Sequence, residues 1–138
     1  MLNDLDIYNS KYKKKILKEI NKTFKGNNFI FGPSVKRFEK NLKLYTGSKY
    51  AITVKSGTDA LFLSLKSLNL KKGDQVIIPS FSWISVLEVV LLLNLKPIFA
   101  DTDINNFNID LNKIEKLISK KTKVIISTSL FGRSIDLN

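Results

Sequence analysis

The sequence predicts an α/β protein: a three-layer, mostly parallel sheet with helices on both faces. Two observations lead to this class. Short apolar segments alternate along the chain with longer segments whose apolar residues recur at helical spacing. The short segments are apolar almost throughout, which is typical of strands that are buried on both faces. At 138 residues, the chain is long enough for one domain with a real core and too short for two of ordinary size.

The first third of the chain is predicted to hold two helices and a strand. A basic helix is expected over about residues 10–24, with a break at Gly26. Ser34 is a suitable cap for a second helix, which Gly47 ends. The apolar segment 50–54 is interpreted as a half-buried strand.

Helices and strands alternate in the rest of the chain. Helices are predicted after Ser56, Ser85 and Asp110, because each is a good capping residue followed by apolar residues at helical spacing. Ser85 also has Glu88 three residues later, which is the pattern of a capping box. The expected strands are residues 75–79, 96–100 and 123–127. Ligands of such sheets bind at the carboxyl ends of the strands.

The composition excludes several functions. The chain contains no cysteine and no histidine, so it lacks disulfides, thiolate metal sites, the commonest general base and the commonest transition-metal ligand. The net charge of +11 suggests a nucleic-acid partner, but only Arg37 and Arg133 among the 23 basic residues are arginines. Nucleic-acid sites favour arginine forks, so we interpret the excess as a solvated lysine face and expect no nucleic-acid partner. Since the sequence shows no signal peptide and no apolar span, we expect a soluble cytoplasmic protein without membrane association.

The turn that precedes the helix after Ser56 is the most informative local feature. Gly57 allows a sharp turn, and the helix then begins with unpaired N–H groups at the positive end of its dipole. This arrangement suits a phosphate. The alternative is simple capping, since Ser56 and Asp59 fit a capping box in which Asp replaces the usual Glu or Gln. The two roles compete in part, because a capping side chain occupies the same N–H groups.

A series of motifs, in family order and spacing, resembles the N-terminal part of the DegT/DnrJ/EryC1/StrS family of pyridoxal-phosphate-dependent sugar aminotransferases. The motifs are residues 29–33, 38–39, 50–51, 56–61, 73–77, 79–83, 97–103, 121–126 and 130–132. The resemblance implies that residues 26–138 are the N-terminal portion of a fold-type I large domain. Residues 1–25 would then be an N-terminal helical segment.

The resemblance also implies a site for pyridoxal 5'-phosphate. Gly57 and Thr58 would bind the phosphate, with the backbone N–H of Asp59 as a further donor. Trp83 would stack on the pyridine ring, for which a flat indole is physically suited. The alternative for Trp83 is a packing role in the core.

The resemblance places the catalytic groups elsewhere. The carboxylate that pairs with the pyridine nitrogen, and the lysine that forms the Schiff base, are expected beyond Asn138, so no catalytic residue is assigned. Lys55 lies near the phosphate turn but matches no catalytic motif. Ser129 stands where many relatives have histidine. Asp101 and Asp103 are interpreted as a strand end and a turn cap, and no metal site is expected.

By this resemblance, a complete enzyme would move an amino group from an amino acid, with glutamate expected, to the keto group of a nucleotide-linked sugar. Its product would enter surface polysaccharide or aminosugar biosynthesis, and its active sites would form in a homodimer. The 138 residues alone are expected to bind the cofactor weakly and to catalyse nothing, and the abrupt end suggests a truncated gene product. Two alternatives stay open: a sugar dehydratase of the same family, with histidine in place of the lysine, and a non-catalytic α/β module. The sugar, the nucleotide and the position aminated are not specified.

Overall fold

The computed structural model describes residues 5–135, with side chains from residue 10 onward. The chain divides into two compact units, one up to Thr53 and one from Val54 onward. The boundary that the sequence suggested, after residue 25, lies one residue before the end of the first helix, α1 (Leu5–Gly26), and inside the first unit. No helix in the described part of the chain is long and apolar enough to cross a membrane.

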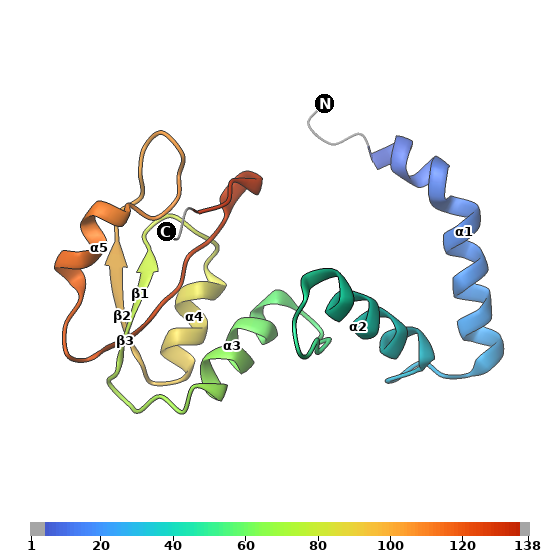
Figure 1. Ribbon diagram of the computed structural model, residues 1–138, viewed down its shortest axis with the longest axis horizontal. Coiled ribbons are helices and arrows are strands. Elements are labelled where there is room, and N and C mark those ends of the chain that lie inside the picture. The colour runs from blue at the N-terminus through green and yellow to red at the C-terminus, as the bar shows by residue number, and fades with distance from the viewer. Residues whose placement is uncertain (1–4, 136–138) are drawn as a thin grey trace. The chain divides into compact units, whose positions relative to one another are not determined.

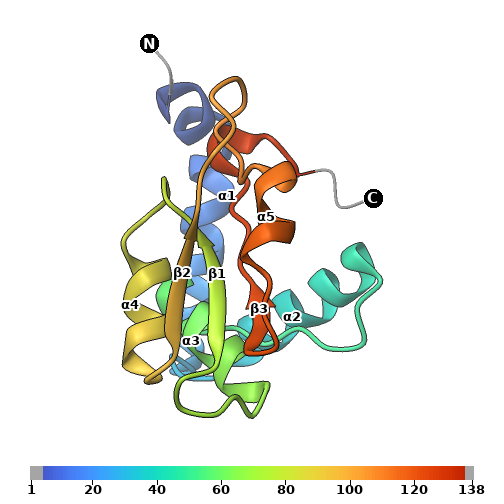
Figure 2. The same ribbon diagram turned by 90° about the vertical axis from the view of Figure 1, so that its left-hand side faces the viewer.

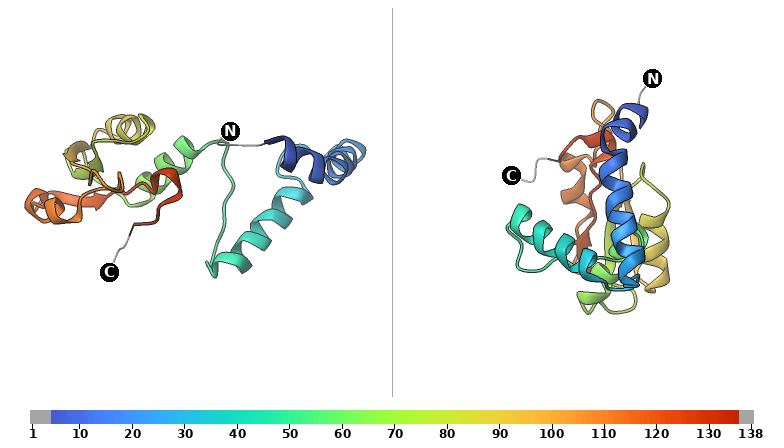
Figure 3. Two further views of the ribbon diagram at one scale, coloured as in Figure 1. Left: turned by 90° about the horizontal axis from the view of Figure 1, so that it is seen from above. Right: turned by 90° about the vertical axis from the view of Figure 1, so that its right-hand side faces the viewer.

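The first unit contains two helices, α1 and α2 (Pro33–Thr46) (Figure 1). Helix α1 is unbroken and begins five residues before the predicted start (Figure 3). The carboxylate of Glu19 on α1 forms ion pairs with Lys22, at 2.6 Å, and with Arg37 on α2, at 3.1 Å. The pair with Arg37 joins the two helices on their exposed side, and the pair with Lys22 lies within α1.

Helix α2 begins differently from the prediction. Its N-cap is Gly32 rather than Ser34, and no side chain caps it. Pro33 occupies the first turn, where its missing N–H is not needed. Gly32 is buried, and a Cβ atom there would lie 2.3 Å from the carbonyl oxygen of Asn28. The close backbone approach therefore requires glycine at position 32, and Ser34 lies inside the helix that begins at Pro33.

The prediction of a strand over residues 50–54 is wrong. In the described residues this segment pairs with no strand, and Tyr50 and Ile52 are largely exposed. The N–H of Thr53 donates to the carboxylate of Glu39 instead. The backbone N–H and C=O groups of a strand need hydrogen-bond partners on a neighbouring strand. Apolar alternation within one segment does not provide such a neighbour.

The second unit is built on a parallel sheet. Its strands are β1 (Gln75–Pro79), β2 (Lys96–Ala100) and β3 (Thr122–Ile125), in the order β2-β1-β3. Both pairings are parallel. The first two strands have the predicted bounds, and the third is shifted toward the N-terminus. The parallel sheet confirms the predicted α/β class.

Helices cover both faces of this sheet. They are α3 (Gly57–Ser67), α4 (Ser85–Leu92) and α5 (Leu111–Leu117). Figure 2 shows α4 on one side of the strands and α5 on the other. Since successive residues of a strand point to opposite faces, Val76 and Ile78 of β1 pack with Leu65 of α3 and with α4. Ile77, between them, packs against Ile114 of α5.

Two predicted helix caps are confirmed. The hydroxyl of Ser56 accepts a hydrogen bond from the N–H of Asp59 at 3.1 Å, at the start of α3. The carboxylate of Asp110 accepts from the N–H of Asn112 at 3.0 Å, at the start of α5. These caps depend on neighbouring residues alone, which explains why the sequence predicts them.

The capping box predicted at Ser85 is wrong. The N-cap of α4 is Ile84, without a side-chain hydrogen bond, and Ser85 lies buried within the helix. A backbone turn supplies partners for the first N–H groups: Val86 donates to the carbonyl of Trp83, and Leu87 to that of Ile84. A side-chain cap is therefore unnecessary.

Candidate functional site

A pocket of about 450 Å³ lies at the carboxyl ends of β1 and β3, beside the start of α3. Its walls come from α3, from the loop between β1 and α4, from the first turn of α4 and from the residues after β3. The lining residues are Gly57, Thr58, Leu61, Ser82, Trp83, Ser85, Val86, Ile126, Ser127 and Thr128. The fold therefore brings three of the four predicted site residues, Gly57, Thr58 and Trp83, to one pocket.

The start of α3 lines one side of this pocket. In the described structure, nothing accepts a hydrogen bond from the N–H of Gly57 or of Thr58. A Cβ atom on Gly57 would meet nothing within 4 Å, so the space beside this turn is open. Two free N–H groups at the positive end of an 11-residue helix form a site that suits a phosphate.

Asp59, the fourth predicted residue, does not line the pocket. Its N–H donates a hydrogen bond to the hydroxyl of Ser56. A phosphate would therefore accept a hydrogen bond from this N–H only if the bond to Ser56 were broken. Its carboxylate lies 3.7 Å from the ammonium group of Lys55, whose side chain is 84% exposed. Lys55 therefore pairs with Asp59.

The side chain of Trp83 supplies an apolar wall of the pocket. It is 76% exposed, so it has no core-packing role within the described residues. Its backbone carbonyl begins the turn into α4, which attaches it to a buried helix. The face of its indole is therefore available to a flat ring.

Sequence reasoning missed four hydroxyl groups of the pocket, those of Ser82, Ser85, Ser127 and Thr128. The hydroxyls of Ser82 and Thr128 lie 3.1 Å apart and form a hydrogen bond. A signal for these residues was present. Ser82, Ser127 and Thr128 lie shortly after the ends of β1 and β3, and the carboxyl ends of parallel strands are where ligands bind.

The two aspartates after β2 have structural partners. Asp101 accepts a hydrogen bond from the ammonium group of Lys113 at 3.1 Å, which raises the pKa of Lys113 because the carboxylate stabilises its charged form. Asp103 accepts from the N–H of Asn105 at 2.7 Å, which confirms the turn-capping interpretation.

Within residues 5–135, no cluster of three or more acidic, histidine or cysteine side chains could hold a metal ion. Ser129 is exposed at the start of a 3-10 turn, η1 (Leu130–Gly132).

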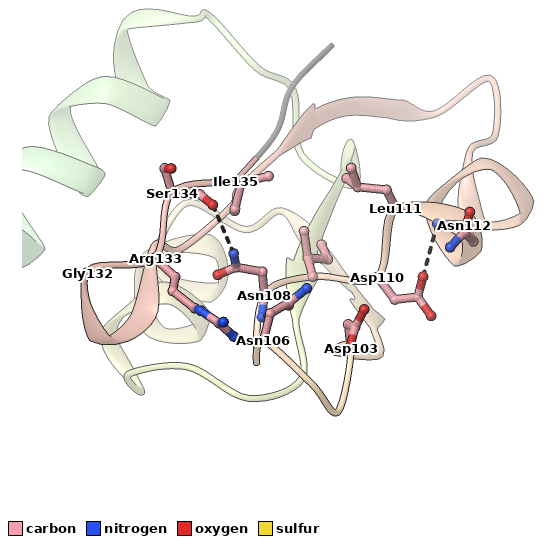
Figure 4. Close-up of a pocket in the computed structure, with 11 residues that line it drawn as sticks. Asp103, Asn106, Asn108, Asp110, Leu111, Asn112, Gly132, Arg133, Ser134 and Ile135 are labelled. Carbon is pink, nitrogen blue, oxygen red and sulfur yellow. Dashed lines mark hydrogen bonds between the residues drawn. The ribbon is translucent and has the colours of Figure 1, made fainter.

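A second pocket, of about 480 Å³, lies between the loop after β2 and the segment after η1 (Figure 4). Asn108 is 7% exposed there, and its side-chain nitrogen donates to the carbonyl of Ser134. The oxygen of the same amide has no partner in the described structure. Arg133 donates to the carbonyl of Asn105 and so joins the two segments. This pocket contains none of the predicted site residues, and the pocket at α3 is the better candidate site.

The sequence model of the DegT/DnrJ/EryC1/StrS aminotransferase family matches residues 10–138. One curated relative, dTDP-3-amino-3,6-dideoxy-alpha-D-galactopyranose transaminase of Aneurinibacillus thermoaerophilus, is 36% identical over 97% of this chain and 37% of its own length. UDP-2-acetamido-2-deoxy-3-oxo-D-glucuronate aminotransferase of Pseudomonas aeruginosa is 36% identical over 98% of this chain and 38% of its own length. GDP-4-keto-6-deoxy-D-mannose 3-dehydratase of Yersinia pseudotuberculosis is 36% identical over 94% of this chain and 34% of its own length. The chain thus spans little more than a third of these relatives.

Solved structures show the same fold. A DegT DnrJ EryC1 StrS aminotransferase from Brucella abortus superimposes with a TM-score of 0.90 at 30% identity, over 99% of this chain and 38% of that one. NtdA from Bacillus subtilis, solved with bound cofactor PMP, superimposes with a TM-score of 0.86 at 35% identity, over 91% of this chain and 29% of that one. Both comparisons agree with the predicted fold class.

Proposed function

The chain belongs to the DegT/DnrJ/EryC1/StrS aminotransferase family, and on that premise we propose that its protein uses pyridoxal 5'-phosphate to place an amino group on a nucleotide-linked keto sugar. The observation that carries the proposal is the pocket that joins the start of α3 to Trp83. It combines an anion site with a flat aromatic wall, and this cofactor has a phosphate and a flat ring.

The residues of the pocket fit the cofactor. The N–H groups of Gly57 and Thr58, with the Thr58 hydroxyl, would bind the phosphate, and Trp83 would cover one face of the ring. A volume of about 450 Å³ is within the usual range for small-molecule sites. When bound, pyridoxal phosphate supplies the carbonyl that carries the amino group and the ring that accepts electrons as bonds break. The chain's own residues hold and orient it.

The rest of the proposal rests on the relatives. An aminotransferase acting on a dTDP-linked or UDP-linked sugar needs an amino-acid donor, for which we propose glutamate. We further propose a homodimer as the active form and a role in surface polysaccharide or aminosugar synthesis. The 138 residues by themselves would catalyse no transfer, because the lysine and the ring-pairing carboxylate that the family uses are not assigned within them.

A dehydratase is the second candidate function. The dehydratase from Yersinia pseudotuberculosis is 36% identical, the same figure as for the transaminase from Aneurinibacillus thermoaerophilus. Identity over this part of the chain therefore does not separate the two reactions. The distinction would depend on whether the complete protein has lysine or histidine at the Schiff-base position.

The test uses the complete protein that contains these residues, supplied with the cofactor, glutamate and a nucleotide-linked keto sugar. Mass spectrometry of the sugar distinguishes the reactions, since transamination replaces oxygen by nitrogen whereas dehydration removes oxygen and adds none. A gain of nitrogen supports the proposal. Loss of oxygen alone supports the dehydratase, and a protein that binds no cofactor would be a non-catalytic module.

Thr58→Ala tests the site itself. A hydrogen bond to a charged group contributes about 1.5–3 kcal/mol, so cofactor affinity is expected to fall by about tenfold or more. Trp83→Phe, which keeps a smaller ring, is expected to weaken binding less. Ser64→Ala is the matched control, because it removes an exposed hydroxyl from the same helix away from the pocket. If the Thr58→Ala and Trp83→Phe variants both bind the cofactor with the same affinity as Ser64→Ala, the proposed site is wrong.

A further inference from the structure

A hydrogen bond between two hydroxyl groups crosses the candidate site. The side-chain oxygens of Ser82 and Thr128 lie 3.1 Å apart, although the two residues are separated by 46 positions in the chain. Ser82 follows β1 and Thr128 follows β3, and both line the pocket. The bond therefore ties together two loops at the carboxyl edge of the sheet.

Ser82 directly precedes Trp83, a residue that is 76% exposed. Packing within the described residues therefore does not hold the indole, and its position depends on the backbone that carries it. Two backbone hydrogen bonds flank this loop: Ser80 donates to Ala100 of β2 at 2.8 Å, and Val86 donates to Trp83 at 3.1 Å. Of the side chains in residues 80–84, Ser82 makes the single hydrogen bond in the described structure.

Phe81 and Ser82, which are adjacent in this loop, contact segments on opposite sides of β1. The ring of Phe81 contacts that of Phe107, in the loop after β2, at a centroid distance of 5.9 Å. Ser82 is tied to Thr128, beyond β3. Because β2 and β3 flank β1, these two contacts hold the loop from both sides just before Trp83.

We propose that Ser82 and Thr128 are positioning residues that fix Trp83 for the flat ring of the cofactor. This inference rests on the proposed function. A loop that is ordered before binding loses less conformational entropy when the ligand arrives, so the bond increases affinity without touching the cofactor. Either hydroxyl can donate this hydrogen bond, and neither side chain needs a further partner to form it.

The experiment compares Thr128→Val, which keeps the shape but not the hydroxyl, with Thr128→Ser, which keeps the hydroxyl. Cofactor affinity and the circular dichroism of the bound cofactor are measured on the complete protein, with Ser82→Ala and the double variant alongside. One neutral hydrogen bond corresponds to about a two- to tenfold change in affinity. We expect Thr128→Val and Ser82→Ala to lose that much and to weaken the dichroism at saturation, whereas Thr128→Ser retains both.

The double variant separates positioning from direct contact. If the two hydroxyls act through one bond, the double variant binds no worse than either single variant. Additive losses would mean that each hydroxyl contacts the cofactor by itself, and the inference would be overturned. It would also be overturned if Thr128→Val lowered only the melting temperature of the cofactor-free protein, with affinity and dichroism unchanged. If the wild-type protein binds no cofactor, both this inference and the proposed function are wrong. If the wild type binds the cofactor but the variants give one of the contrary results above, the inference alone is wrong.

Discussion

The carboxylate of Glu39 accepts two hydrogen bonds from Thr53, one from the backbone N–H and one from the hydroxyl, each at 2.8 Å. Glu39 lies on α2, and Thr53 lies in the segment that the sequence predicted as a strand. The bond gives this backbone N–H the partner that a neighbouring strand would have given. It also lowers the pKa of Glu39, because the backbone N–H of Thr53 stabilises the ionised carboxylate.

We therefore predict that Glu39→Gln changes the pH dependence of stability. A carboxyl group with a lowered folded-state pKa stabilises the fold above its ordinary pKa of 4.5, and this contribution disappears as pH falls through the folded value. Glu39→Gln should be less stable than the wild type at neutral pH and no less stable in strong acid. Urea unfolding at a series of pH values measures the difference.

Glu115→Gln is the control for this prediction, since Glu115 is exposed on α5 and no side chain among the described residues binds its carboxylate. Its unfolding curves should follow those of the wild type at every pH. A gap between Glu39→Gln and the wild type that stays constant into strong acid would contradict the role of the ionised carboxylate.

Gly32→Ala is predicted to destabilise the first unit. The added Cβ would lie 2.3 Å from the carbonyl oxygen of Asn28, so the backbone must shift, and overpacking of this kind costs about 1–3 kcal/mol. Gly26→Ala is the matched control, because its Cβ would meet a flexible side-chain atom at 3.5 Å. Thermal unfolding of the two variants should differ clearly, and equal melting temperatures would show that the turn at residue 32 yields without strain.

Ser56→Ala is predicted to have opposite effects on stability and on cofactor binding. Loss of the N-cap should reduce stability by about 1 kcal/mol. It also frees the N–H of Asp59, which would then be a third donor to a phosphate, so cofactor affinity should rise by about two- to tenfold. Thermal unfolding and cofactor titration test the two parts separately. Weaker binding would show that the Ser56 hydroxyl itself contacts the phosphate.

Ile77→Ala is predicted to unfold much of the second unit. Ile77 is fully buried in the central strand, and truncation of such a residue costs about 2–5 kcal/mol. Ile125, its neighbour on β3, is 44% exposed, so Ile125→Ala should cost much less. Denaturant unfolding that ranks the two variants in the reverse order would contradict the assignment of the core.

The parts of the fold that the sequence predicted are those that depend on nearby residues. The strands at 75–79 and 96–100 and the caps at Ser56 and Asp110 follow from apolar runs and from capping side chains within a few positions. The failures at Ser34, at Ser85 and over residues 50–54 have different origins. At Ser34 and Ser85 the helices begin with backbone turns and need no side-chain cap, and the N–H of Thr53 bonds to the carboxylate of Glu39, 14 positions away, instead of to a strand.

By itself, the sequence determined the alternation of helices and strands, the α/β class and the turn at Gly57 that begins α3, because periodicity and turn chemistry are local properties. The tertiary structure alone decided the geometry of the pocket that Trp83 shares with that turn, and it alone showed that Ser82 meets Thr128. Both depend on the order in which the strands lie side by side, with β1 between its neighbours. That order brings together residues far apart in the chain, and their contacts stabilise the fold only once the whole sheet has formed.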